Sequence, residues 1–312
     1  MDMLEGLLDG PRARGAFLLR AVLDPPWSLR IEDESPLAVL AVVRGEAWLC
    51  PDGAAAHRIG PGDVAITRGP DHYTLADDPQ TPPTVVILPG QRCTYAADGR
   101  PLDEEWSLGV RTWGERGGGT VVLVGCYERA GELSRPLLAA LPPLLTLPRE
   151  EWDQPLVRLL ADEISRDGPG QRAVLDRLLD LLLVAGLRTW FVRQRDEAPA
   201  WFRAQSDPVV GRALRLLHHN PAHPWTVARL AAAAGVSRAA LARRFTALVG
   251  EPPMSYLTGW RLALAADLLC REDATLGAVA RQVGYATPFA LSAAFKRERG
   301  ISPAEHRALA GA

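Results

Sequence analysis

The sequence is poor in lysine and lacks any long apolar segment. Among its 35 basic residues Lys296 is the single lysine, and the rest are arginine, a bias typical of a GC-rich genome. The longest apolar run, Leu178–Leu187, is interrupted by Asp180 and falls well short of the ~20 residues that span a bilayer. Residues 1–20 mix acidic, basic and apolar positions, unlike a secretory signal peptide. We therefore expect a cytoplasmic protein with no membrane partner.

Cysteine and histidine are also scarce, which argues against a disulfide framework and against a metal centre. The 4 cysteines have no CxxC spacing, so we expect free thiols in a reducing compartment. Of the 6 histidines, only His57 and His72 lie between residues 15 and 130. A metal site needs a convergent set of ligands. We therefore expect neither a metal nor a cofactor.

The net charge of −2 conceals a division of the chain. From Asp207 onward, 13 Lys+Arg against 7 Asp+Glu give +6, and the remaining 22 against 30 give −8. A basic C-terminal part on an acidic body is typical of a nucleic-acid-binding module joined to a domain that does not touch DNA.

The basic part contains the same helix-turn-helix pattern twice. In the first copy, Val227–Ala234 has the spacing of an amphipathic helix, and Gly235 follows where helices commonly end. Ser237 is a good N-cap for the next helix, whose Leu241 and Phe245 point inward. The outer residues of such a second helix meet base edges in the major groove, and arginine pairs well with guanine. The residues predicted to face DNA here are Ser237, Arg238, Ala239, Ala242 and Arg243.

The second copy repeats this pattern over Leu276–Val283, Gly284 and a helix capped by Thr287. Phe289, Leu291 and Phe295 are predicted to be mainly packing residues of that helix. Its residues predicted to face DNA are Thr287, Ser292, Lys296 and Arg297.

One amphipathic stretch, Met254–Cys270, joins the two copies. As a single rigid helix it would hold the two recognition helices for successive major grooves, about 34 Å apart. Its Arg261 is predicted to be exposed and to reach backbone phosphate.

The segment from about Asp207 to Ala308 contains the motifs Leu230-Ala-Ala-Ala-Ala-Gly235-Val-Ser237, Leu241-Ala-Arg-Arg-Phe245, Gly250-Glu-Pro-Pro-Met-Ser-Tyr256, Arg261-Leu-Ala-Leu-Ala-Ala-Asp-Leu-Leu269, Val279-Ala280, Gly284-Tyr285 and Phe295-Lys-Arg-Glu-Arg-Gly300-Ile-Ser-Pro303. On these motifs it resembles the DNA-binding domain of the AraC/XylS family. The resemblance implies binding to double-stranded promoter DNA, with RNA polymerase as a further candidate partner. The family often has arginine after the serine of the second recognition helix, where this chain has Ala293. We therefore expect the first copy to dominate specificity.

Residues 15–130 consist of short apolar runs separated by Gly, Pro and Asp, which predicts a β-sandwich or barrel. The expected strands are Phe17–Val22, Leu37–Val43, Ala47–Leu49, Val64–Thr67, Val85–Pro89 and Thr120–Val124. The runs Val43-Arg-Gly-Glu-Ala-Trp48, Gly62-Asp63 and Gly69-Pro-Asp-His72 resemble the turn motifs of the cupin fold.

Many cupins are metalloenzymes, and His72 matches the histidine of the family's second motif. Their metal site also requires two histidines and usually a glutamate on the strand before the first of these turns. Ser28–Pro36, which occupies that place, contains no histidine. We therefore expect a ligand sensor and not an enzyme, with a cupin-type enzyme fused to a DNA-binding tether as an alternative.

The mouth of a cupin-like barrel is a common small-molecule site. A pocket for an unknown small-molecule effector is predicted from aromatic walls and a few polar groups, namely Trp27, Arg30, Trp48, His72, Tyr73, Trp106 and Arg111. A second alternative is a redox sensor of the same architecture, in which Arg92 favours the thiolate of Cys93.

Residues 149–196 contain two helical patterns, Trp152–Ile164 and Arg172–Arg193. The broad apolar face of the second predicts either packing on the barrel or pairing with a second copy, and we favour a homodimer through this segment. The predicted fold is α+β. A cupin-like effector domain (1–148) and a helical dimerisation segment (149–196) precede a linker (197–206, within the proline-containing stretch Asp196–Ser206) and an all-α DNA-binding domain (207–312). The function expected is a DNA-binding transcription regulator controlled by an effector.

Overall fold

A computed structural model describes residues 17–102, 106–127, 135–152, 155–194, 198–271 and 273–310. The chain divides into two compact units. One is formed from residues 11–130 and 138–193, and residues 194–312 form the main part of the other. Among the described helices, none is both long enough and apolar enough to cross a membrane.

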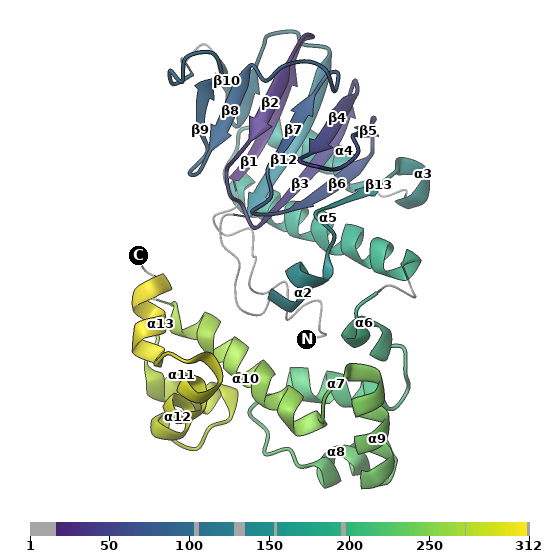
Figure 1. Ribbon diagram of the computed structural model, residues 1–312, viewed down its shortest axis with the longest axis vertical. Coiled ribbons are helices and arrows are strands. Elements are labelled where there is room, and N and C mark those ends of the chain that lie inside the picture. Colours follow the sequence, from purple (N-terminus) through teal and green to yellow (C-terminus); the bar gives the residue numbers. More distant parts are fainter. Residues whose placement is uncertain are drawn as a thin grey trace. The chain divides into compact units, whose positions relative to one another are not determined.

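The first unit is built on two facing β-sheets (Figure 1). In the larger sheet the strand order is β10-β11-β1-β12-β3-β6-β13, and in the smaller it is β5-β4-β7-β2-β8-β9. The larger sheet contains β1 (Phe17–Leu23), β3 (Leu37–Arg44), β6 (Val64–Arg68), β10 (Ser107–Gly109), β11 (Thr112–Gly114), β12 (Thr120–Tyr127) and β13 (Leu144–Leu147). The smaller contains β2 (Ser28–Ile31), β4 (Ala47–Pro51), β5 (His57–Ile59), β7 (Tyr73–Ala76), β8 (Val85–Leu88) and β9 (Arg92–Tyr95).

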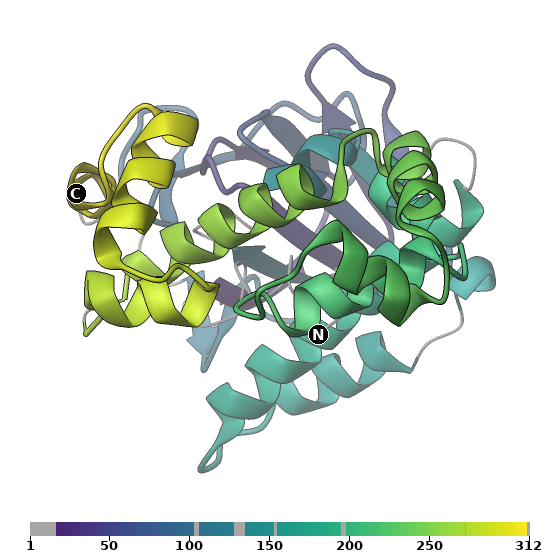
Figure 2. The same ribbon diagram turned by 90° about the horizontal axis from the view of Figure 1, so that it is seen from below.

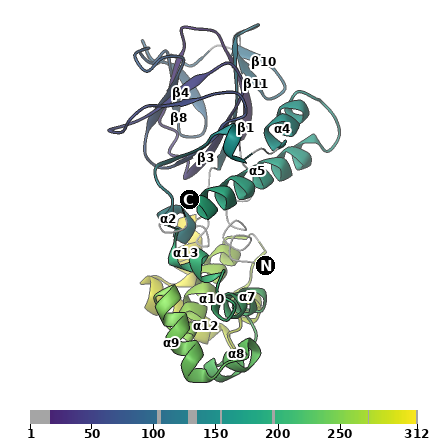
Figure 3. The same ribbon diagram turned by 90° about the vertical axis from the view of Figure 1, so that its right-hand side faces the viewer.

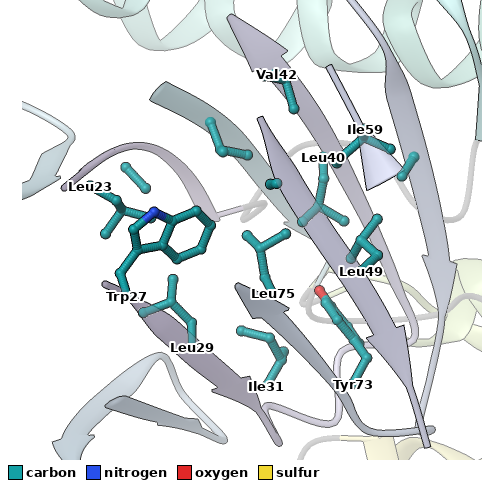
Figure 4. Packing of buried hydrophobic residues seen from close by; sticks show 14 of the residues in the cluster. Leu23, Trp27, Leu29, Ile31, Leu40, Val42, Leu49, Ile59, Tyr73 and Leu75 are labelled. Atoms are coloured by element: carbon teal, nitrogen blue, oxygen red, sulfur yellow. The ribbon is translucent and has the colours of Figure 1, made fainter. Parts of the chain in front are cut away.

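Alternate residues of each strand point between the sheets and form one core. Leu40 and Val42 of β3 meet Leu49 of β4 and Leu75 of β7 in this layer (Figure 4). All six predicted strands are present. The shorter strands β2, β5, β7, β9, β10, β11 and β13 were not predicted, because runs of three or four residues carry too little periodicity to stand out.

The helical pair packs against the larger sheet, and α4 (Leu156–Ile164) and α5 (Gln171–Arg193) lie side by side there (Figure 3). Gly125 of β12 makes the close approach possible, since a Cβ at this position would lie 2.5 Å from a methyl carbon of Leu179. The inner face of α5, including Leu175, Leu182 and Phe191, is buried in this way. Packing on the barrel therefore accounts for much of the broad apolar face. The short helix α3 (Arg149–Trp152) belongs to the same unit, and α2 (Arg135–Ala140) contains residues of both units.

The second unit is all-α. Its helices are α6 (Ala200–Ala204), α7 (Val210–His219), α8 (Val227–Ala234), α9 (Arg238–Val249), α10 (Pro253–Leu269), α11 (Leu276–Val283), α12 (Pro288–Arg299) and α13 (Pro303–Ala310). The long helix α10, yellow-green in Figure 2, runs from the first group of helices to the second. This confirms the predicted arrangement of two helix-turn-helix motifs joined by one helix.

Part of the expected linker (197–206) forms a packed helix in the described residues. Residues 200–204 form α6, which packs against α9 and buries Trp201 and Ala204. Burial of a tryptophan side chain supplies enough apolar contact to hold a short helix in place. Residue 197 of the expected linker lies outside the described residues.

Candidate functional site

The first helix-turn-helix motif is set by caps at both of its helices. Thr226 caps α8 by accepting from the amide of Arg229, and α8 ends at Gly235, which has a φ of 74°. The amide of Val236 returns to the carbonyl of Ala231 at 3.0 Å, which closes the helix end as in a Schellman motif. Ser237 then caps α9 by accepting from the amide of Ala240 at 3.2 Å. The turn between the two helices is thereby fixed by local hydrogen bonds.

The outer face of α9 presents two arginines that are free to bind. Leu241 and Phe245 are fully buried on the inner face, while Arg238 and Arg243 are exposed. Within the described part of the chain, neither of these guanidinium groups makes a hydrogen bond or an ion pair. Of the other predicted residues on α9, Ser237 and Ala239 are exposed and Ala242 is half-buried.

The neighbouring Arg244 has a different role, although it follows Arg243 directly. Its Nη2 lies 2.6 Å from Oδ2 of Asp207, whose other carboxylate oxygen accepts from the amides of Val209 and Val210 at the start of α7. Arg244 is therefore a structural brace between α9 and α7.

The second helix-turn-helix motif has the same arrangement of helix caps. Thr275 caps α11, Gly284 ends it with a φ of 87°, and Thr287 caps α12 by accepting from the amide of Ala290 at 3.1 Å. Leu291 and Phe295 are buried, as expected for the inner face of α12.

Phe289 contradicts the expectation that it packs inside. Its side chain is 85% exposed, on the N-terminal turn of α12. The cap at Thr287 places Phe289 at the second helical position, which points away from the inner residues Leu291 and Phe295. The spacing of two residues from the cap was the sequence signal that places Phe289 on the outer face. The apolar character of its side chain alone led to the wrong prediction that it packs inside.

The residues of α12 and its cap that were predicted to face DNA differ in exposure. Thr287 and Lys296 are exposed, Ser292 is half-buried, and Arg297 is exposed with its Nε 3.2 Å from Oε1 of Glu298. Ala293 is exposed. The outer face of α12 thus consists of small and apolar side chains, with cations near its C-terminal end.

Arg261 is not the exposed phosphate contact that was predicted. It is half-buried, and its Nε and Nη2 donate to the backbone carbonyls of Pro221 and His223 at 2.7 and 2.9 Å. Burial lowers the pKa of this guanidinium. Arg261 therefore ties α10 to the loop before α8 by donating to two backbone carbonyls of that loop.

The barrel unit contains an interior cavity between its two sheets. Its walls are almost entirely apolar, from β1, β2, β3, β7, β8, β11 and β12, and the cavity is narrow, about 30 Å³. Tyr73 and Cys126 contribute the polar atoms of the interior, and Asp33 and Gln91 contribute to the lining. Nε2 of Gln91 donates to Oδ2 of Asp33 at 3.1 Å. Burial raises the pKa of Tyr73, so its hydroxyl stays protonated.

The structure does not gather the predicted pocket residues around this cavity. Of the seven, only Tyr73 lines it. Leu29 and Ile31 of β2 point inward, so Arg30 points outward, where it bonds both oxygens of Asp52 at 2.6 Å and Oε1 of Glu32 at 3.0 Å. The Arg30 pairing lowers the pKa of Asp52.

The other five predicted residues are dispersed. His72 lies 4.0 Å from Glu32, beside Arg30 on the outer face. Trp27 is buried in the core beside Leu23 and Leu29, away from Tyr73 (Figure 4). The remaining positions are Trp48, half-buried on β4, Trp106, stacked on Trp113 at 4.8 Å, and Arg111, which donates to the carbonyl of Leu18 at 3.4 Å.

The alternation of side chains along each strand was the sequence signal that predicts which residues line the interior cavity. Positions 17, 19 and 21 of β1, and 29 and 31 of β2, share the inward face. Cys126 belongs to the same set on β12 and was missed because it ends a run of apolar residues.

Cys93 remains a prediction, and its surroundings disfavour a thiolate. Arg92 and Cys93 are adjacent on β9, so their side chains project from opposite faces. Burial raises the pKa of the Cys93 thiol. Among the described residues, no group of three or more His, Cys, Asp or Glu side chains is placed to hold a metal ion.

Comparisons with known proteins match both units. A cupin family model matches residues 2–192, and a helix-turn-helix domain model matches residues 230–308. The chain is 33% identical to an AraC-like transcription regulator of Streptomyces antibioticus over 312 residues, covering 98% of each protein. It is 34% identical to the HTH-type transcriptional regulator AlkR of Acinetobacter baylyi, covering 98% of this chain and 99% of that one.

A solved structure of the DNA-binding domain of AdpA in complex with a target DNA is 36% identical over 33% of this chain and 93% of that one, with a TM-score of 0.31. The full-length relatives are named as transcription regulators, and the match to them runs through both units. Together with the cap-defined tandem motifs, this shows that the chain belongs to the AraC family and is a DNA-binding transcription regulator with an N-terminal cupin domain.

Proposed function

We propose that this regulator recognises its promoter sites mainly through α9, with α12 as a weaker reader and backbone clamp. The observation that carries this proposal is the contrast between Arg238 and Arg243, exposed and unengaged, and Ala293 at the outer face of α12. Guanidinium groups can bond guanine in two places at once, whereas a methyl group carries little sequence information. A regulator of this kind acts on the chromosome, in the cytoplasm.

On α12, the apolar side chain of Phe289 is available for a base contact in place of a polar side chain. An exposed aromatic side chain on the N-terminal turn of a recognition helix can contact the methyl group of thymine. Lys296 and Arg297 are suited to phosphate contacts, which add affinity without sequence information. RNA polymerase remains a further candidate partner.

The cupin unit supplies the effector site in this proposal, at the interior cavity. Its apolar walls favour a small, largely apolar molecule with one polar group near Tyr73. Because the cavity is narrow, such a ligand has to displace side chains, for example the pair formed by Asp33 and Gln91. Binding would then change the populations of states that differ in DNA affinity.

A homodimer through residues 149–196 completes the proposal. The outer side of α5 carries a second apolar stripe of Val174, Leu178, Leu181, Ala185 and Val192, at intervals of three, four and seven residues. Val174, Leu181 and Val192 are 45%, 50% and 54% exposed. A stripe with this spacing suits pairing with the same stripe of a second copy, which would place two DNA-binding units on two half-sites.

The proposal for DNA is tested by selecting bound sequences from a random pool and measuring affinity for the selected site. Arg238→Ala with Arg243→Ala should weaken specific binding about 100-fold or more, because each bidentate contact contributes roughly tenfold or more. Arg212→Ala, which removes an exposed arginine from α7, is the matched control and should change affinity little. Equal losses in the two variants would contradict the role of α9.

The dimer is tested separately by sedimentation equilibrium of the full chain. Leu181→Glu places a charge in the stripe and should shift the protein towards monomer, whereas Arg172→Glu, at an exposed polar position of α5, should not. A wild-type protein that stays monomeric at micromolar concentration would rule out this dimer.

A further inference from the structure

The barrel unit carries an open groove on its outside that neither DNA binding nor the interior cavity explains. It has a volume of about 620 Å³ and lies among β1, the end of β3, the β10–β11 hairpin, the loop after β11 and the turn that joins α4 to α5. Pockets for small ligands commonly measure about 300–1,000 Å³. The groove therefore has the size of a small-molecule site.

Arginine dominates the polar lining of this groove. Arg20, Arg44, Arg116 and Arg166 line it, and Asp167 is the one carboxylate among its lining residues. This is opposite to the charge of the surrounding chain, since before Asp207 acidic residues outnumber basic ones by 30 to 22. Four arginines against one lining carboxylate leave the groove with an excess of positive charge, which attracts anions.

One of these arginines is held by hydrogen bonds, one has an acidic neighbour, and two are without partners among the described residues. Arg44 donates from Nε and Nη2 to the carbonyls of Gly119 and Gly118, which anchors the loop before β12. Arg166 lies 3.6 Å from Glu163. The side chains of Arg20, which is half-buried, and Arg116 make no hydrogen bond or ion pair with any described residue. A half-buried, unpaired guanidinium is costly, and a bound anion would compensate it.

The floor of the groove is apolar. Val22 follows Arg20 on the same face of β1, and Val110 in the β10–β11 turn is 49% exposed beside it. Such a floor offers contact to the carbon skeleton of a ligand, and the arginines offer contact to its charges.

We propose that this groove binds a small organic molecule that carries at least two negative charges, as phosphate or carboxylate groups. Arg20 and Arg116 bind its anionic groups, Arg166 reaches it from the α4–α5 turn, and Val22 and Val110 contact its skeleton. Because Arg166 lies between α4 and α5, a bound anion joins that turn to β1. The binding itself does not depend on the proposed function. An influence of the bound anion on regulation, through α4 and α5, rests on the proposed dimer.

The test is isothermal titration calorimetry on the full chain, with pyrophosphate and citrate as separate probes and the ionic strength held constant with potassium chloride. One saturable site per chain is expected with at least one probe, and the better probe tells phosphate from carboxylate. Arg20→Gln with Arg116→Gln should weaken the Kd at least tenfold without lowering the Tm, since neither side chain has a bonding partner to lose.

Two controls separate the groove from general charge effects. Arg92→Gln with Arg158→Gln removes the same charge from exposed positions of the same unit, outside the groove. Arg238→Gln with Arg243→Gln removes it from α9, where polyanions that mimic DNA could bind. Both control variants should keep the Kd within about twofold of the wild-type value.

Three results would overturn the proposal. They are the absence of saturable heat with both probes, an equal weakening in the controls, and an unchanged Kd in the groove variant. If the double groove variant does not fold, Arg116→Gln alone replaces it, since that side chain is fully on the surface. Binding of a polyglutamate peptide while pyrophosphate and citrate fail also overturns it, in favour of a protein partner.

Discussion

In α9, Arg243 stands on the outer face six residues after the cap at Ser237, whereas Ala293 holds the same place after Thr287 in α12. Ala239 and Phe289 correspond in the same way, two residues after each cap. Inside, the two motifs agree, since Leu241 and Phe245 correspond to Leu291 and Phe295. The comparison teaches that caps and inner residues conserve the scaffold, while the outer residues are free to differ because they contribute little to folding.

The largest expected effects on stability come from substitutions at the equivalent inner residues of the two motifs. Phe245→Ala and Phe295→Ala should each lower the free energy of unfolding of the surrounding helices by about 3–5 kcal/mol, because both rings are fully buried and each change leaves a cavity. Urea denaturation followed by circular dichroism measures this. A loss below about 1 kcal/mol in one variant alone would show that the two anchors are not equivalent.

The two motifs should differ in how they tolerate a side chain at the glycine that ends their first helix, Gly235 or Gly284. Both have positive φ, so alanine costs about 1–2 kcal/mol at either position. At Gly235 a Cβ meets nothing within 4 Å, but at Gly284 it would lie 2.7 Å from Cα of Ala222 and 2.8 Å from Nη2 of Arg261. Gly284→Ala should therefore cost at least about 1 kcal/mol more than Gly235→Ala. Equal midpoints in urea would contradict this difference.

Acid should destabilise the first half of the DNA-binding unit. His218 is buried with its Nε2 2.8 Å from the hydroxyl of Tyr256, and burial lowers its pKa from 6.5 to about 3. Below pH 6.5 the unfolded chain takes up a proton that the folded chain does not, so stability falls with pH down to about 3. Between pH 7 and pH 5 this amounts to about 2 kcal/mol. The variant His218→Gln should flatten this part of the stability profile, and an unchanged slope would show that other groups cause it.

The smallest effect is expected at Phe289, where the outer faces differ. Phe289→Ala should weaken binding about fivefold at sites with thymine opposite α12 and leave affinity unchanged where thymine is absent. Stability should change by less than about 0.5 kcal/mol, because the ring is 85% exposed. Electrophoretic mobility shifts on paired probes that differ at one base measure the effect. A uniform loss on all probes would indicate a contact without sequence information.

Local signals explain why the helical unit was predicted closely. The helices Val227–Ala234 and Leu276–Val283 begin and end at the predicted residues, since threonine caps and glycine ends act within one turn of chain. The placement of Phe289 and Arg261 failed for a related reason. Side-chain type alone assigned the first to the core and the second to solvent, while the surrounding fold assigned them the opposite places.

The barrel shows the limit of sequence reasoning more plainly. Its long strands were predicted from apolar runs, but the residues that meet at the interior cavity come from seven strands distant in the sequence. Which face of each strand points inward depends on register, and a shift of one residue reverses it. Arg30 and His72 therefore joined an outer cluster with Glu32 and Asp52 instead of the barrel interior.

The sequence by itself determined the two units, the tandem motifs and the arginines of α9, because capping, periodicity and charge are properties of neighbouring residues. The tertiary structure alone decided that α5 has one face on the barrel and one exposed, and that Arg20, Arg44, Arg116 and Arg166 surround one groove. Those four residues belong to segments separated by long stretches of chain. They come together only because sheet pairing and helix packing bring their segments to the same side of the barrel.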